Sequence, residues 1–328
     1  MSSCNKSNSF VKKKNDTTTD VYITGSIGDK AVYWKNGKIN YLDDNGAAYT
    51  IPTSLFVSDN DDVYVSGVDH VQAAGNPSRC IYWKNGQINY LTSTQQILQA
   101  NAYSVFVSGN DVYVAGYQSI NGESYATYWK NGTANVIGPV ASSASSVFVS
   151  GSDVYLGGGV RQLHVPNATY WKNGSPVSLT TGTNEGEVAS IIVSNGHIYA
   201  VGNATFSDGP HAVYWKDDTM VELTNSSYNS EAESIYISGN DVYITGYQTV
   251  NGVSTATYWK NNVPVTLSTN ESSSSSICVS GNDVYVAGQD KVDTGFVAAY
   301  WKNGKVSHLP DNADIASSIF VKSKTSTP

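Results

Sequence analysis

Two pairs of glutamates, with one residue between the members of each pair, are candidates for acid–base chemistry: Glu185 with Glu187, and Glu231 with Glu233. Carboxyl pairs that face a cleft can act as acid and base in glycoside hydrolysis. These glutamates belong to a set of nine acidic residues in the segments that join repeated units, with no Lys or Arg among them: Asp43, Asp44, Glu185, Glu187, Glu231, Glu233, Glu271, Asp311 and Asp314. Such a set would attract a cationic partner or Ca²⁺. Ordinary solvated loops are the alternative, since no spacing matches a calcium-binding loop.

Two nearly identical segments suggest a different kind of site. They read "YQSINGESYAT" at 117–127 and "YQTVNGVSTAT" at 247–257. The Tyr-Gln pairs that open them, Tyr117-Gln118 and Tyr247-Gln248, could stack on a sugar and hydrogen-bond its hydroxyls. The alternative is that both tyrosines extend a strand and that the likeness records duplication of a repeat.

Residues that occur once among the repeats are a third group of candidates: His70, Arg79, Arg161, His164, Asp208 and His211. His164 and His211 could form a metal site or an acid–base pair if their loops meet, although solvated loop histidines are the alternative. The sequence contains no nucleophile elbow, no phosphate-binding glycine loop and no Cys/His metal spacing. We therefore assign no catalytic residue, no metal ligand and no cofactor beyond a possible Ca²⁺.

All seven tryptophans lie in one repeated motif, typified by "TYWKNG" at 127–132. Successive tryptophans are 49, 46, 42, 44, 44 and 42 residues apart, a period typical of propeller blades. Each unit contains four apolar runs, for example "SVFVS" at 104–108, "DVYVAG" at 111–116 and "ATYWK" at 126–130. The runs are short, rich in Val, Ile, Tyr and Phe, and bounded by Gly, Asn or Ser, which predicts strands. We call them A to D in chain order.

An Asn-Gly turn follows five of the seven tryptophan motifs, and this dipeptide is the strongest hairpin signal in a sequence. Asp217-Asp218 and Asn261-Asn262 take its place in the other two. The strands are apolar on both faces, as a sheet between two other sheets requires. The sequence thus predicts an all-β fold: a seven-bladed β-propeller of four-stranded antiparallel blades. We expect each Trp to pack between blades and the glycines to serve turns.

The ring is expected to close at the end of the chain. The propeller should occupy residues 20–322, between a polar tether (1–19) and a short tail (323–328). The chain enters at a B strand, Asp20-Val21-Tyr22, while "SSIFV" at 317–321 matches the A strand "SSVFV" at 145–149. This C-terminal strand should complete blade 1. The alternative is that Phe10-Val11 forms the A strand of blade 1.

The two faces of such a propeller differ in variability. The A–B and C–D turns on one face are uniform and short. The B–C connections on the other face contain 7 residues in blade 1, 14 in blade 2 and 11 in the remaining five. Function is expected on this B–C/D–A face, because sites lie on variable loops held by a rigid scaffold.

Charge, hydropathy and cysteine content indicate which partners the protein could have and how it could be attached to a membrane. A net charge of −8 argues against nucleic acid as a partner, and no apolar stretch is long enough to span a membrane. Cys80 and Cys278 stand where other repeats have apolar residues, so we expect buried thiols. "MSSCNKSNS" at the start resembles a bacterial lipoprotein box, which makes Cys4 a candidate for lipid attachment.

The repeats resemble those of extracellular bacterial β-propeller proteins. "GNDVYVAGYQ" at 109–118 is similar to the bacterial β-propeller repeat, and "HAVYWKDDTMVEL" at 211–223 resembles a HAF-type repeat. The resemblance implies the fold and no catalytic residues. We expect a monomeric lipoprotein of the bacterial cell envelope, periplasmic or surface-exposed, whose loop face recognises a protein or glycan. The alternative is a glycoside-active hydrolase or lyase that uses the acidic residues at the channel mouth.

Overall fold

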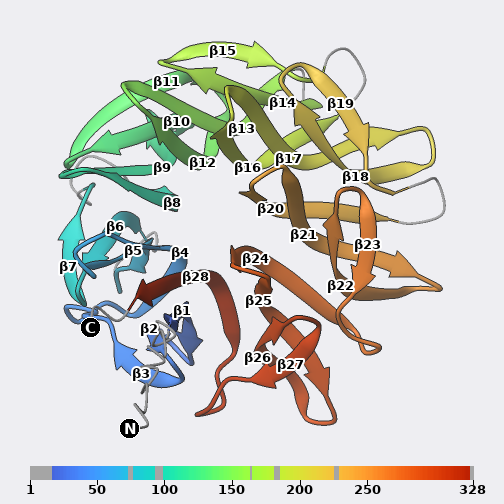
Figure 1. Ribbon diagram of the computed structural model, residues 1–328. Helices are drawn as coiled ribbons and strands as arrows, with labels where there is room; N and C mark the ends of the chain where they lie inside the picture. Colours follow the sequence, from blue (N-terminus) through green and yellow to red (C-terminus); the bar gives the residue numbers. More distant parts are fainter. Residues whose placement is uncertain are drawn as a thin grey trace, which may run out of the picture.

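The computed structural model describes residues 17–72, 77–92, 99–162, 165–180, 185–224 and 229–325. These residues form seven four-stranded antiparallel sheets arranged as a ring (Figure 1). The chain is therefore a seven-bladed β-propeller, as the sequence predicts.

The strands of blades 1 to 4 follow in the order A to D. Blade 1 contains β28 (Ile315–Thr325), β1 (Thr17–Ile27), β2 (Lys30–Lys35) and β3 (Lys38–Tyr41). Blade 2 contains β4 (Tyr49–Val57), β5 (Val63–His70), β6 (Ser78–Lys84) and β7 (Gln87–Tyr90). Blade 3 contains β8 (Ala100–Ser108), β9 (Asp111–Ile120), β10 (Glu123–Lys130) and β11 (Thr133–Val140). Blade 4 contains β12 (Ser142–Ser150), β13 (Asp153–Gln162), β14 (Val165–Lys172) and β15 (Ser175–Ser178).

Blades 5 to 7 repeat the same order. Blade 5 contains β16 (Gly186–Ser194), β17 (His197–Phe206), β18 (Gly209–Lys216) and β19 (Thr219–Glu222). Blade 6 contains β20 (Ser230–Ser238), β21 (Asp241–Val250), β22 (Val253–Lys260) and β23 (Val263–Thr266). Blade 7 contains β24 (Ser272–Ser280), β25 (Asp283–Val292), β26 (Gly295–Lys302) and β27 (Lys305–His308).

The last strand closes the ring, and this prediction is confirmed. Strand β28 pairs with β1, with Val321 opposite Val21, and Figure 1 shows the dark red strand beside the first blue ones. The Lys322 ammonium donates to the carbonyls of Ser58 and Asp59 in blade 2, at 2.7 and 2.8 Å. The first and last strands extend the propeller to residues 17 and 325, three residues beyond the expected limits at each end.

Each tryptophan packs against the preceding blade. All seven are at most 1% exposed. Trp129 of blade 3, for example, contacts a cluster that contains Tyr64 and Cys80 of blade 2. Six blades place a buried alanine at the position of Cys80, which explains why that thiol is buried: Ala31, Ala126, Ala168, Ala212, Ala256 and Ala298. Cys278 is buried too, so both thiols lie where the sequence predicts.

The lysine and asparagine of the tryptophan motif tie the C–D turn to the A–B turn. In blade 3 the Lys130 ammonium lies 2.8 Å from the Asp111 carboxylate and 5.2 Å from the centre of the Tyr113 ring. The Asn131 side chain donates to Asp111 and accepts from the backbone N–H of Val112. Equivalent contacts recur in blades 1, 2, 4, 6 and 7. The repeated motif is therefore the framework of a blade.

The variable B–C connections are shorter than the sequence suggests. In blades 3 and 6 the B and C strands extend until two-residue turns join them, Asn121-Gly122 and Asn251-Gly252. All four turn residues have positive φ, as a type I′ hairpin requires. The segments expected to be loops of 11 residues are thus mostly strand. Tyr117 and Tyr247 lie within strands β9 and β21, which was the alternative interpretation.

A β-bulge occurs at the same position of the A strand in every blade and directs one extra side chain toward the central channel. The bulged residues are Thr53, Tyr103, Ser145, Ala189, Glu233, Ser275 and Ser317.

Opposite each bulge lies a B-strand glycine. A Cβ on Gly246 would lie 1.9 Å from the carbonyl oxygen of Glu231, so this glycine permits the close approach of two backbones. One glycine in each blade therefore serves the bulge, which corrects the expectation that glycines serve only turns.

Candidate functional site

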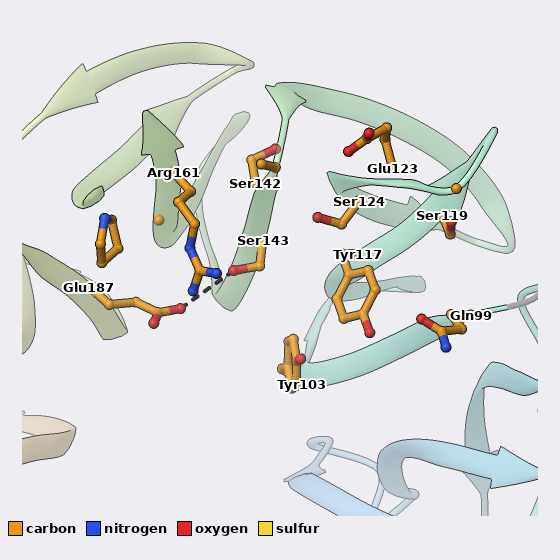
Figure 2. A pocket seen from close by; sticks show the side chains of 14 residues that line it. Gln99, Tyr103, Tyr117, Ser119, Glu123, Ser124, Ser142, Ser143, Arg161 and Glu187 are labelled. Atoms are coloured by element: carbon orange, nitrogen blue, oxygen red, sulfur yellow. Dashed lines mark hydrogen bonds between the residues drawn. The ribbon is translucent and has the colours of Figure 1, made fainter. Parts of the chain in front are cut away.

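A cleft of about 430 Å³ lies between blades 3 and 4. It opens on the B–C/D–A face, where function was expected. Its wall combines hydroxyl, amide, carboxylate and guanidinium groups with two aromatic rings (Figure 2). The residues that contribute these groups are Gln99, Tyr103, Tyr117, Ser119, Glu123, Ser124, Ser142, Ser143, Arg161 and Glu187.

Two tyrosines of blade 3 form an aromatic corner in this cleft. The ring centres of Tyr103 and Tyr117 lie 6.2 Å apart, with the planes tilted by 39°. The Asn101 amide donates to both hydroxyls at 3.3 Å, which fixes the two rings relative to each other. Burial raises the pKa of both phenols, so they stay neutral hydrogen-bonding groups.

A second cavity of about 260 Å³ continues from the cleft toward the channel. It shares Tyr103 and Glu187 with the cleft and adds Asn203, Glu231 and Glu233. Three of the four glutamates highlighted by the sequence therefore line one cavity.

The strand register explains how these glutamates meet. Glu187 stands opposite Asn203 in blade 5, and Glu231 stands opposite Tyr247 in blade 6. Glu233 is the bulged residue of blade 6, so it faces the channel together with Glu231. Across the cavity, the Ser143 and Ser145 hydroxyls of blade 4 each donate to Glu187 at 3.4 Å, and Figure 2 shows the Ser143 contact.

Two of these glutamates, Glu231 and Glu233, have a raised pKa. Burial, reinforced by the charges of Glu231 and Glu187, raises the pKa of Glu233 to about 7. The pKa of Glu231 is raised as well, chiefly by burial. Burial and then the Glu231 charge raise the pKa of Tyr247 to about 12. A carboxyl that is half protonated near neutral pH can exchange a proton with a bound molecule.

The other predicted site residues lie elsewhere. Gln118 is 6% exposed and, like Gln248, does not line either cavity. Glu185 is exposed and precedes strand β16. His164 lies outside the described residues.

His211 is buried in blade 5. It is stacked on Phe206 and lies 3.3 Å from the Asp208 carboxylate and 3.5 Å from that of Glu222. These carboxylates surround the imidazole within one blade, away from both cavities described above.

The nine acidic residues do not form one electronegative mouth. Asp44 pairs with Lys30, and Glu271 pairs with Lys291. Asp314 accepts a hydrogen bond from the backbone N–H of Gly28 at 2.6 Å. Within the part of the chain that the structure describes, no group of three or more His, Cys, Asp or Glu side chains is arranged to hold a metal ion. The Ca²⁺ expectation stays a prediction.

Sequence reasoning missed Tyr103, which lines both cavities. The sequence does contain a signal for this residue. Tyr103 in blade 3 and Glu233 in blade 6 occupy the same position of the repeat, where the other five blades have only Thr, Ser or Ala. Sequence reasoning named Arg161 as a candidate but did not say which site it would join; the structure shows that it lines the cleft. The other singly occurring Arg, Arg79, is instead bound to the buried carboxylate of Asp69.

Neither a protein-family profile nor an individual curated protein matches the sequence. Solved structures do resemble the fold. The extracellular domain of BT4673 from B. thetaiotaomicron, described as part of a one component system, has a TM-score of 0.51 and 12% identity over 84% of this chain and 36% of that one. TolB from Acinetobacter baumannii has a TM-score of 0.51 and 9% identity over 78% of this chain and 66% of TolB.

At these identities the likeness concerns the fold alone. The chain also spans only about a third of the BT4673 domain and about two thirds of TolB. In the described residues there is no helix of the length and hydropathy needed to cross a bilayer.

Proposed function

We propose that this protein is a glycan-binding module of the bacterial cell envelope that holds an oligosaccharide in the cleft between blades 3 and 4. The observation that carries the proposal is the aromatic corner of Tyr103 and Tyr117, set among hydroxyl, amide and charged groups. An aromatic face packs against the apolar face of a sugar ring, while the surrounding polar groups hydrogen-bond its hydroxyls. The volume of the cleft, about 430 Å³, lies in the range of sites for small ligands.

The envelope location rests on two supports. The repeats resemble those of extracellular bacterial propellers, and one of the similar structures is the extracellular domain of a bacterial protein. Lipid attachment at Cys4 is part of this proposal. Metabolic labelling of the expressed protein with a fatty-acid analogue tests it, and Cys4→Ser should abolish the label.

Calorimetric titration against a panel of neutral, amino and acidic oligosaccharides tests the binding proposal. Tyr117→Ala should weaken binding about tenfold or more, because a stacked aromatic contributes on the order of 1–2 kcal/mol. Gln289→Ala is the matched control, since Gln289 occupies the corresponding B-strand position in blade 7, outside the cleft. Equal affinities for both variants would contradict the proposal.

A second candidate is hydrolysis of the bound glycan, which the glutamates of the inner cavity favour. Glu233, with a pKa of about 7, would donate a proton to the glycosidic oxygen. Glu231 or Glu187 would take a proton from the water that attacks the anomeric carbon, so the C–O bond breaks as a new one forms. Glu233→Gln should then abolish product formation while binding persists; intact oligosaccharide after prolonged incubation with the unaltered protein would exclude this candidate.

A further inference from the structure

The cleft and the inner cavity continue into a third cavity on the propeller axis. This cavity, of about 120 Å³, is lined by residues of all seven blades. It shares Tyr103, Ser145, Ala189 and Glu233 with the inner cavity. The three cavities therefore adjoin one another and mark a path from the rim between blades 3 and 4 to the centre of the ring.

A ring of serines forms the wall of the axial cavity. One serine follows each bulge: Ser54, Ser104, Ser146, Ser190, Ser234, Ser276 and Ser318. Several accept a hydrogen bond from the backbone of the next blade. Ser104 accepts from the N–H of Val147 at 3.3 Å, and Ser318 accepts from that of Leu55 at 3.2 Å. These contacts draw the A strands together around the axis.

An aromatic layer lies beneath the serines, two residues further along the A strands. The ring centres of Phe56 and Phe106 are 5.1 Å apart, those of Phe106 and Phe148 4.9 Å, and those of Phe56 and Phe320 5.4 Å. Rings at this separation are in direct contact. Ile192, Tyr236 and Cys278 occupy the same position in the remaining blades. A sugar chain that enters from the loop face would meet this layer of apolar side chains below the serines.

We infer that the path from the cleft to the axis receives one end of an oligosaccharide chain, with the terminal unit in the inner cavity, and that it does not bind the middle of a long chain. This inference rests on the proposed glycan binding and adds that the ligand enters the cavities end first. The terminal unit should present hydroxyl or amino groups, because the inner cavity combines the Ser145 hydroxyl and the Asn203 amide with the carboxyls of Glu187, Glu231 and Glu233. A terminal carboxylate or sulfate would be repelled there.

The first test compares chain lengths. Cellotetraose, xylotetraose, N-acetylchitotetraose and the chitosan tetramer serve as probes, each with soluble polymers of the same linkage in two lengths. For every probe that binds, calorimetry should give the same number of proteins per chain at both polymer lengths. A number that rises with chain length would overturn end recognition and leave glycan binding intact. Absence of binding to the whole panel would contradict the proposed function and this inference with it.

The second test fills the inner cavity. Asn203→Trp places a large side chain there, and Gln289→Trp places the same side chain at the corresponding position of blade 7. Asn203→Trp should weaken binding of the best tetrasaccharide at least tenfold, while Gln289→Trp retains it. Matching melting temperatures of the two variants confirm that both fold. Unchanged affinity in Asn203→Trp would show that the terminal unit does not reach the inner cavity and would overturn the inference.

Discussion

The imidazole Nδ1 of His197 lies 2.8 Å from the carboxylate Oδ2 of Asp217, across the A–B and C–D turns of blade 5. In six other blades the same two positions hold an Asp and an Asn that share a hydrogen bond, as Asp111 and Asn131 do at 2.7 Å. The Asp217 carboxylate also accepts from the backbone N–H of Ile198, the role that the Asn side chain has elsewhere. Blade 5 therefore has a different residue at each of these two positions, but the side-chain contact between its A–B and C–D turns is kept.

This exchange predicts compensation between two substitutions. His197→Asp places two carboxylates side by side, and Asp217→Asn removes the charged partner of the imidazole. Each should lower the free energy of unfolding by about 0.5–1 kcal/mol, a small effect because both side chains are half exposed. The double variant recreates the pair of the other blades and should recover most of this loss. Urea denaturation measures all four proteins, and additive losses in the double variant would contradict the prediction.

The half-buried carboxyl of Glu233 predicts a pH-dependent stability. Its pKa is about 7 in the folded protein against an ordinary value of 4.5, so the folded state binds the proton more tightly than the unfolded state. The stabilisation from this proton is complete below pH 4.5 and is lost as the pH rises through 7. Glu233→Gln should match the unaltered protein at pH 4 and exceed its stability by about 1–3 kcal/mol at pH 8.

Denaturation of both proteins across this pH range tests the sign. Glu123→Gln is the control for removal of one carboxyl, because Glu123 is exposed at the rim of the cleft. A Glu233→Gln variant that is destabilised equally at pH 4 and pH 8 would show that burial does not control this carboxyl.

The glycine opposite each bulge should tolerate no side chain. A Cβ on Gly246 would lie 1.9 Å from the backbone oxygen of Glu231, so the two strands must separate. Gly246→Ala should cost about 3 kcal/mol, at the upper end of what overpacking of a core typically costs. Gly109 is a turn glycine with positive φ and open space around it, so Gly109→Ala should cost only about 1 kcal/mol. Equal losses in thermal denaturation would contradict this account of the bulge.

The closing strand should be essential for a folded ring. Removal of residues 315–328 takes away β28, which pairs with β1 and packs against blades 2 and 7. We expect the truncated chain to lose its cooperative unfolding transition, since an open ring exposes the edge of β1 and the apolar faces of two blades. A synthetic peptide of residues 313–328 should restore the transition. A truncated chain that melts as the full chain does would show that closure is dispensable.

Much of the architecture could be predicted because each blade repeats local signals. The Trp spacing, the Asn-Gly turns and the spare strand at 317–321 each depend on residues that are close in sequence or copied from another blade. Repetition makes such predictions reliable, because seven independent units give the same pattern. The second turn of the blade was misjudged at Asn121-Gly122, where the same hairpin signal was read as part of a loop.

The site was only partly predictable. Tyr117, Glu187, Glu231 and Glu233 were named as candidates from residue type, but nothing in the order of the residues told which of the nine acidic side chains meet. Tyr103 and Glu233 are 130 positions apart and line one cavity, because bulges in blades 3 and 6 both turn a side chain into the channel.

The amino-acid sequence by itself determined the number of blades, their four strands, the buried tryptophans and the strand that closes the ring, because short-range turn and packing preferences specify each of these. The tertiary structure alone decided where the cavities lie, that Asp44 and Glu271 are neutralised by lysines, and that Glu187, Glu231 and Glu233 converge. These properties depend on closing the sheets around a common axis. That closure brings side chains from separate blades within reach and shields some of them, such as Glu233, from water, and both effects arise only when the ring is complete.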